Sequence, residues 1–166
     1  VEAFLSGRAE RIRDYTKDDE YRRAPVATDA GRTQEFRLRL DDQIAVCTFK
    51  DKQIVDGLEV NREREFTVDD PDCFRELLDR IGCRVFLRKV KRGTQYSLDG
   101  VNAELSDVED LGTFLELEIV REEEGDTEAA RAHLQDLFLQ AGISLQEVES
   151  RTYTSMLLNR ITPDSV

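Results

Sequence analysis

Four segments of the chain each carry two like charges at positions i and i+2, the spacing that puts both side chains on one face of a β-strand. The pairs are Arg37 with Arg39, Lys89 with Lys91, Glu63 with Glu65, and Glu116 with Glu118. Carboxylate pairs suit hard cations such as Mg²⁺ or Mn²⁺, whereas arginine and lysine pairs suit phosphate oxygens. A sheet face that carries all four pairs is therefore predicted to bind a complex of a divalent metal with a polyphosphate.

A ligand-free interpretation accounts for the same pattern. An amphipathic antiparallel sheet whose outer face is solvated also shows ladders of charge, because neighbouring strands neutralise one another. Lys50 fits a charged face poorly, since Ile44 and Val46 share its side of the segment. Periodicity alone favours the solvated sheet over a binding face.

The charged pairs lie in segments that alternate between apolar and polar residues, as strands of an antiparallel sheet do. Residues 14–33 are polar and contain Pro25 and Gly31, so they are expected to form a loop with a short strand near Asp19–Arg22. Gly93 is expected to interrupt the chain between two strands. The predicted strands are 34–40, 43–50, 58–68, 84–92, 95–98, 101–107 and 113–121.

Four helices complete the prediction. The first dozen residues have apolar positions at helical spacing. A second helix follows Asp70, which offers an N-cap, and ends before Gly82. The others are expected near 126–141, before Gly142, and at 152–160. These elements predict an α+β fold and a single domain over residues 1–166.

Composition narrows the classes of partner. The 166 residues carry a formal net charge of −12, which disfavours nucleic acid and anionic membranes, so an anionic ligand must be held by a local basic cluster. The three cysteines form no CxxC pair and predict reduced thiols of a cytoplasmic protein. The sequence shows no apolar run of membrane-spanning length and no secretory leader.

Several runs of sequence together resemble the CYTH superfamily, which contains class IV adenylate cyclases and thiamine triphosphatases and is also called the triphosphate tunnel metalloenzymes. The resemblance covers roughly residues 20–158. The runs that carry it are VNREREFTVDDPDCFRELLDRIG, VFLRKVKRGTQYSL and VEDLGTFLELEI, with EFRLRL, TFKDK and SRTYTSMLL in support.

The resemblance implies an eight-stranded antiparallel β-barrel that forms a triphosphate tunnel, with helices packed outside. It implies catalytic roles for Lys50, Lys89 and Lys91, and metal binding by the two glutamate pairs with Mg²⁺ or Mn²⁺ as cofactor. By the same resemblance, the substrate-binding residues are Arg37, Arg39, Lys50, Lys89, Lys91 and Arg151, and the metal ligands are Glu63, Glu65, Glu116 and Glu118.

The sequence departs from the family pattern at three places. The 166 residues do not include the family's N-terminal strand with Glu-x-Glu-x-Lys, and Val1 is expected to fall where the family's next helix begins, so that strand either precedes Val1 or is absent from this member. Asn61 replaces a frequent arginine. Ser106 stands where many members carry aspartate, although Glu104 offers a carboxylate on the same face. These differences put catalytic competence in doubt more than the fold.

The resemblance implies a triphosphate-containing small molecule as ligand: ATP, tripolyphosphate or thiamine triphosphate. Hydrolysis of an inorganic, nucleoside or organic triphosphate is the favoured reaction, although nothing in the sequence identifies a base-binding pocket that would separate it clearly from cyclisation. A site of charges without Ser, Cys or His fits phosphoryl transfer, which asks little covalent chemistry of the protein. The alternatives are a class IV adenylate cyclase, which makes cyclic AMP and pyrophosphate from ATP, and a non-catalytic module that binds polyphosphate or nucleotide. A homodimer is left open.

Overall fold

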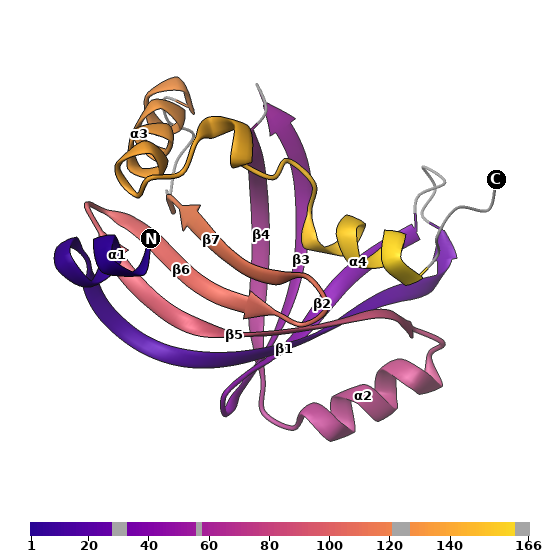
Figure 1. Ribbon diagram of the computed structural model, residues 1–166. Coiled ribbons are helices and arrows are strands. Elements are labelled where there is room, and N and C mark those ends of the chain that lie inside the picture. Colours follow the sequence, from indigo (N-terminus) through magenta and orange to yellow (C-terminus); the bar gives the residue numbers. More distant parts are fainter. Residues whose placement is uncertain (28–32, 56–57, 121–126, 162–166) are drawn as a thin grey trace. The chain divides into compact units, whose positions relative to one another are not determined.

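The computed structural model describes the backbone of residues 1–27, 33–55, 58–120 and 127–161 (Figure 1). Side chains are described for residues 1–25, 34–49, 63–120 and 128–161. The chain divides into two compact units. The first unit comprises Val1–Tyr15 with Arg92–Thr152, and the second comprises Thr16–Lys91 with Tyr153–Val166. The single domain expected from the sequence stays a prediction.

Seven strands are described. They are β1 (Glu10–Ala27), β2 (Thr33–Asp41), β3 (Ile44–Val55), β4 (Leu58–Val68), β5 (Arg84–Leu98), β6 (Val101–Val108) and β7 (Gly112–Glu118). Their order in the sheet is β4-β3-β2-β1-β5-β6-β7. The pairs β1–β2, β2–β3, β3–β4 and β6–β7 are antiparallel. With the helices below, this confirms the predicted α+β class.

The N-terminal region differs from the prediction. Helix α1 (Glu2–Arg8) is shorter than the predicted first dozen residues, and the long strand β1 occupies most of a segment in which only a short strand near Asp19–Arg22 was predicted within a loop. The reason lies in the side chains that β1 buries. Asp19 and Arg22 are both almost fully buried. They are separated by an odd number of positions and therefore project from opposite faces of the strand. Because polar side chains are buried on both faces, β1 lacks the apolar alternation by which strands are recognised.

The second correction concerns Gly93, which does not interrupt a strand but lies inside the continuous β5. A Cβ atom at this position would lie 2.3 Å from the Leu105 carbonyl oxygen and 2.7 Å from Ser106 Cα. Both neighbours belong to β6. The glycine therefore permits a close approach of two backbones rather than a turn.

Replacing Gly93 with alanine is expected to lower the free energy of unfolding by about 1–3 kcal/mol, because the added methyl group overpacks against rigid backbone. Urea denaturation measures the change. Gly7→Ala is the matched control: nothing lies within 4 Å of its added Cβ, and Gly7 is in α1. Alanine there is expected to be neutral or to stabilise by up to ~1 kcal/mol. Equal unfolding free energies for the Gly93 variant and the wild type would contradict the close approach.

Helix α2 (Pro71–Arg80) begins and ends where its capping residues predict. It starts after Asp70, whose carboxylate accepts a 2.9 Å hydrogen bond from the Cys73 backbone N–H. Gly82 follows it with φ of +85°, in the left-handed region that favours glycine. The remaining helices are α3 (Thr127–Gln140), the short 3₁₀ helix η1 (Leu145–Glu147) and α4 (Tyr153–Ile161).

Strands β2, β3 and β4 of the second unit have two chemically different faces. One face is apolar: Leu38 is the register partner of Cys47, and Cys47 is the partner of Phe66. Phe66 packs edge-on against Phe74 of α2, with ring centroids 6.2 Å apart. Helix α2 therefore covers the apolar face. The alternate residues of the same strands form the other face, which carries the predicted site residues.

Candidate functional site

A row of three polar side chains crosses β2, β3 and β4 on the charged face. Arg37 is the register partner of Thr48, and Thr48 is the partner of Glu65. The Arg37 Nη2 donates to Thr48 Oγ1 at 3.0 Å and lies 3.5 Å from Glu65 Oε1. The Thr48 hydroxyl donates to the same Glu65 oxygen at 2.7 Å. One end of the Arg37 guanidinium is therefore fixed toward β4.

The other side of this guanidinium has an unused donor. Arg37 Nε is buried and has no hydrogen-bond partner among the residues that the structure describes. A buried donor without a partner is unfavourable, because it has lost its hydrogen bond to water. An anionic oxygen bound here would remove that cost and would gain a charge-assisted hydrogen bond.

Asp19 on β1 is a site residue that the sequence reasoning missed. Its side chain has no exposed surface and lies opposite Arg39 in the β1–β2 register. The Arg39 guanidinium donates from Nε to Oδ1 at 2.6 Å and from Nη2 to Oδ2 at 2.9 Å. The Lys89 ammonium lies 3.0 Å from the same Oδ2. The buried carboxylate thus joins one basic residue from each of two strands.

The charge of Asp19 is maintained by these neighbours. Burial by itself acts to raise the pKa of the carboxyl group, but the hydrogen bonds from Arg39 and the charges of Lys89, Arg39 and Arg37 outweigh burial. The pKa of Asp19 is therefore held below its ordinary value. Asp19 is ionised at neutral pH and acts as an internal counter-ion.

The two predicted lysines of β5 are both buried, with side chains 5% exposed for Lys89 and 3% for Lys91. The Lys89 Nζ lies 5.7 Å from the ring centroid of Tyr21 and 5.2 Å from that of Tyr153. The Lys91 Nζ lies 5.9 Å from the Tyr153 ring. Tyr153 is the first residue of α4, so cation–π contacts connect this helix to both lysines.

We call Arg37, Arg39, Lys89 and Lys91 the basic cluster. All four belong to the second unit, and Asp19 connects two of them directly. Burying several cations costs several kcal/mol each unless counter-charges or a ligand compensate. The signal for Asp19 is present in the sequence, because Lys17, Asp19 and Tyr21 alternate with period two and the short strand predicted near Asp19–Arg22 includes this residue, but no role was assigned to it.

The predicted acidic pair Glu116 and Glu118 is on β7 of the first unit. In the β6–β7 register, Glu116 lies opposite Glu104, and Glu118 lies opposite Asn102. The Tyr15 hydroxyl donates to Glu104 Oε2 at 2.9 Å. Burial raises the pKa of Tyr15, and the Glu104 charge raises it further, so the phenol remains a hydrogen-bond donor at neutral pH. The carboxylates of Glu104, Glu116 and Glu118 thus share one face of the β6–β7 pair.

These carboxylates are suitable donors for a divalent ion. Mg²⁺ is commonly bound through one or two carboxylates together with waters and substrate phosphates. Within the described ranges, no group of three or more His, Cys, Asp and Glu side chains gathers closely enough to hold a metal by itself. Glu116 and Glu118 are two carboxylates of the kind that bind Mg²⁺ in company with waters and phosphates, and their metal-binding role stays a prediction.

The remaining predicted residues are placed as follows. The Arg151 side chain, in the first unit, is exposed and pairs with Glu149, with Nη2 2.6 Å from Oε2. Glu63 and Glu65 of β4 are both exposed. The backbone of Lys50 lies opposite Glu63 in the β3–β4 register, but the Lys50 side chain lies outside the described residues. The catalytic, substrate-binding and metal-binding roles of all these residues stay predictions.

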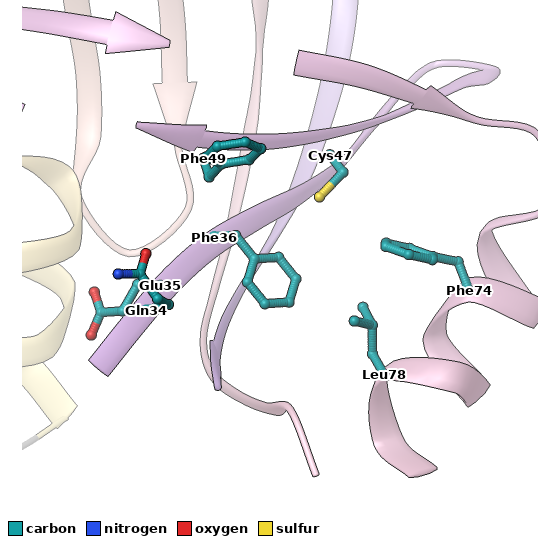
Figure 2. Close-up of a pocket in the computed structure, with 7 residues that line it drawn as sticks. All are labelled: Gln34, Glu35, Phe36, Cys47, Phe49, Phe74 and Leu78. Carbon is teal, nitrogen blue, oxygen red and sulfur yellow. The ribbon is translucent and has the colours of Figure 1, made fainter. Parts of the chain in front are cut away.

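A pocket of about 220 Å³ lies elsewhere in the second unit, between β2, β3 and α2. Figure 2 shows Phe74 and Leu78 of α2 pointing toward Phe36 of β2 and Cys47 of β3. Phe36 adjoins Arg37 along the strand, so this pocket opens on the opposite face from the basic cluster. Its lining is largely apolar and does not suit a triphosphate. Burial raises the pKa of the Cys47 thiol to about 11, which leaves it protonated at neutral pH.

Comparisons with known proteins agree with this architecture. The model of the CYTH domain matches residues 11–153, and the chain therefore belongs to the CYTH domain family. It is similar to adenylate cyclase CyaB of Aeromonas hydrophila, with 30% identity over 112 residues. That match spans 68% of this chain and 59% of the Aeromonas protein, which is less than two thirds of the relative's length.

Solved structures show the same fold. The PH1819 protein from Pyrococcus horikoshii has a TM-score of 0.82 and 25% identity, covering 96% of this chain and 92% of that one. HpAC1 from Hippeastrum, described as a putative adenylyl cyclase with a dominant triphosphatase activity, has a TM-score of 0.59 and 17% identity. That match covers 96% of this chain and 88% of the Hippeastrum protein, and at this identity it shows the fold alone. In the part of the chain that the structure describes, no helix is long and apolar enough to cross a membrane.

Proposed function

We propose that this chain binds the triphosphate group of a small molecule through the basic cluster and hydrolyses it with the help of a divalent metal ion. The observation that carries the proposal is a cluster of four cationic side chains in a protein of net charge −12. Lys89 and Lys91 are buried, Arg37 and Arg39 are largely shielded from water, and the Arg37 Nε has no hydrogen-bond partner among the described residues. Such an arrangement is unfavourable without an anion and becomes favourable with one. Membership of the CYTH family supports the same assignment.

Each part of the basic cluster has a distinct task in this proposal. The Arg37 and Arg39 guanidinium groups present several N–H donors in a fixed plane and so orient a chain of phosphates. Lys89 and Lys91 supply compact charges that neutralise the phosphate oxygens. Both lysines are almost excluded from water, which strengthens their attraction for developing negative charge. These contributions lower the barrier to displacement at phosphorus without a covalent intermediate on the protein.

The metal would be held by Glu116 and Glu118 together with oxygens of the substrate. When bound, a divalent ion bridges phosphate oxygens and neutralises the charge that develops on the leaving group. The contribution of the chain is to place two hard oxygen donors two residues apart on β7, with Glu104 opposite Glu116. Glu63 and Glu65 are further candidate ligands from β4, although Glu65 already accepts from Thr48.

Cyclisation of ATP is the second candidate, and the Aeromonas relative named adenylate cyclase CyaB favours it. The two reactions use the same groups, because both displace a phosphate leaving group in line with an attacking oxygen. They differ in the nucleophile, which is water in hydrolysis and the ribose hydroxyl in cyclisation. The Hippeastrum protein of the same fold is described as a putative adenylyl cyclase with a dominant triphosphatase activity, and a shared fold does not by itself decide between the two reactions.

Incubation with ATP, or with inorganic tripolyphosphate, in the presence of Mn²⁺ separates the candidates by their products. We expect inorganic phosphate, with ADP from ATP and pyrophosphate from tripolyphosphate. Cyclic AMP with pyrophosphate from ATP would instead establish the cyclase. A parallel reaction with excess EDTA measures the metal requirement. Tight binding of ATP or tripolyphosphate without turnover would restrict the function to that of a binding module. If neither binding nor turnover is found, the proposal is overturned.

A further inference from the structure

The Asp19 carboxylate is placed so that both of its oxygens contact members of the basic cluster. Oδ1 accepts from Arg39 Nε, and Oδ2 accepts from Arg39 Nη2 and lies within reach of the Lys89 ammonium. A guanidinium held through Nε and one Nη has its plane fixed by two parallel hydrogen bonds. The Arg39 side chain therefore cannot rotate about its last bonds while Asp19 is ionised.

The same carboxylate restricts Lys89. The ammonium of this residue contacts Asp19 on one side and approaches the rings of Tyr21 and Tyr153 on others. With only 5% of its surface exposed, it has little water to replace these contacts. Asp19 is the one full negative charge among these three neighbours, so it supplies most of the electrostatic attraction that holds Lys89 in place.

A purely structural carboxylate on the same strand shows what a different role looks like. Glu20 follows Asp19 directly and so projects from the opposite face of β1. It accepts from Arg22 at 2.8 Å and from Arg75 at 2.7 Å, and Arg22 also donates to Asp79. This network joins β1 to α2 and includes no member of the basic cluster. Glu20 and Asp19 thus both pair with two cationic side chains, Glu20 being part-buried and Asp19 fully buried, but they differ in what they hold.

We propose that Asp19 is a positioning residue, whose carboxylate fixes the Arg39 guanidinium and the Lys89 ammonium in the orientation in which they bind the phosphate groups of the substrate. This inference rests on the proposed function. Asp19 itself does not contact phosphate, because a buried anion repels one. Its effect passes entirely through the two cations that it holds.

The experiment measures the affinity for inorganic tripolyphosphate by calorimetry, in the wild type and in Asp19→Asn, without metal so that turnover does not interfere. The substitution preserves shape but removes the charge, so the net positive charge of the cluster rises. If Asp19 were only a counter-ion, affinity would rise. Because Arg39 and Lys89 lose their fixed orientation, we expect the affinity for tripolyphosphate to fall roughly tenfold or more. Losses of this size are found when residues that orient ligand-binding groups are removed. The fall should persist at high salt, since salt screens charge but not geometry.

Two further variants make the result decisive. Glu20→Gln is the matched control, and it is expected to lower the melting temperature while leaving tripolyphosphate affinity unchanged. Asp19→Glu keeps the charge but moves the carboxylate by one methylene group, and it is expected to weaken binding as well. It carries the test if Asp19→Asn does not fold. The double variant Arg39→Ala with Lys89→Ala lacks both cations that Asp19 is proposed to hold. Adding Asp19→Asn to this double variant should therefore change the affinity for tripolyphosphate no further.

The outcomes separate this inference from the proposed function. A wild type that does not bind tripolyphosphate contradicts the proposed function itself. A wild type that binds, with both Asp19 variants binding as tightly or more tightly, contradicts only the positioning role. Equal losses for the Asp19 and Glu20 variants would assign both residues to the stability of the fold and would also overturn the inference.

Discussion

Tripolyphosphate is expected to raise the melting temperature of this protein by about 5–10 °C, and Arg37→Ala is expected to lose most of that rise. A ligand that binds only the folded state at a hundred times its dissociation constant stabilises by about 2.7 kcal/mol. For a chain of this size, each kcal/mol corresponds to roughly 2–4 °C. The effect opposes the net charge of −12, and it therefore reports a local cluster rather than a general attraction for anions.

Arg37 is the sharpest position for this test, because its Nε is buried and unpartnered within the described residues. Its replacement removes that donor together with the contacts to Thr48 and Glu65. The free protein should lose little stability, since Glu65 is half exposed and can turn to water. The complex with tripolyphosphate should lose a charge-assisted hydrogen bond. The substitution should therefore reduce the rise in melting temperature caused by tripolyphosphate, and should change the melting temperature of the free protein little.

Arg80→Ala is the matched control for the change in net charge. Arg80 lies on α2, pairs with Glu76 and has a side chain 75% exposed. Its removal should leave the tripolyphosphate shift intact. A wild-type melting curve that tripolyphosphate does not move would argue decisively against a phosphate site. An equal loss in the Arg37 and Arg80 variants would show that overall charge, rather than the basic cluster, controls binding.

The sequence was sufficient for helices α2, α3 and α4 and for the strands whose two faces differ. Helix α2 illustrates this, because Asp70, Pro71 and Gly82 mark its ends by local chemistry that does not depend on the rest of the fold. Strand β2 was recognised because Leu38 alternates with Arg37 and Arg39. The alternation of a strand and the caps of a helix can both be recognised from residues close together in the sequence. Contacts between distant parts of the chain were therefore not needed to predict these elements.

Strand β1 could not be predicted in the same way. Its polar residues have partners on other elements: Asp19 is held by Arg39 of β2 and Lys89 of β5, while Arg22 is held by Asp79 of α2. In isolation such residues indicate a solvated loop, because burying unpaired charge is costly. Only the register, which brings the opposite charges together, makes their burial favourable. Local sequence does not contain that register.

The same limit applies to the candidate site. Equal charges two residues apart correctly placed Arg37 and Arg39 on one face, and Lys89 on a strand that supplies the same cluster. The resemblance to the CYTH family, which the family model confirms, supplied the roles. Asp19 and Tyr153 were missed as members, because neither belongs to a charged pair and their contacts join strands or helices far apart in the chain.

The other large effect is expected on β7, where Glu116→Gln or Glu118→Gln should lower metal-dependent turnover of triphosphate roughly a hundredfold or more. Glutamine keeps the size of the side chain but replaces a charged oxygen by a neutral amide, which Mg²⁺ binds much more weakly. Loss of one group that stabilises developing charge costs about 10²–10³ in rate. The dissociation constant for Mn²⁺, measured by calorimetry in the presence of a non-hydrolysable ATP analogue, should rise in both variants.

The fold should tolerate both substitutions. Glu116 lies directly opposite Glu104 in the β6–β7 register, and like charges facing each other across two strands are destabilising. Removing the charge of Glu116 therefore relieves repulsion, and the melting temperature of the metal-free protein should stay constant or rise. If the glutamates only formed salt bridges on a solvated face, the same variants would cost about 0–1 kcal/mol and leave turnover unchanged.

Glu109→Gln supplies the control within the same unit. Glu109 is exposed, pairs loosely with Arg92 at 3.7 Å and lies between β6 and β7. Its replacement changes the net charge by the same amount, so it should leave both turnover and Mn²⁺ affinity at the wild-type level. If Glu116→Gln and Glu118→Gln also hydrolyse triphosphate with unaltered metal dependence, these glutamates are not metal ligands. In that case the exposed glutamates of β4 become the carboxylates to replace next, because they are the other predicted pair.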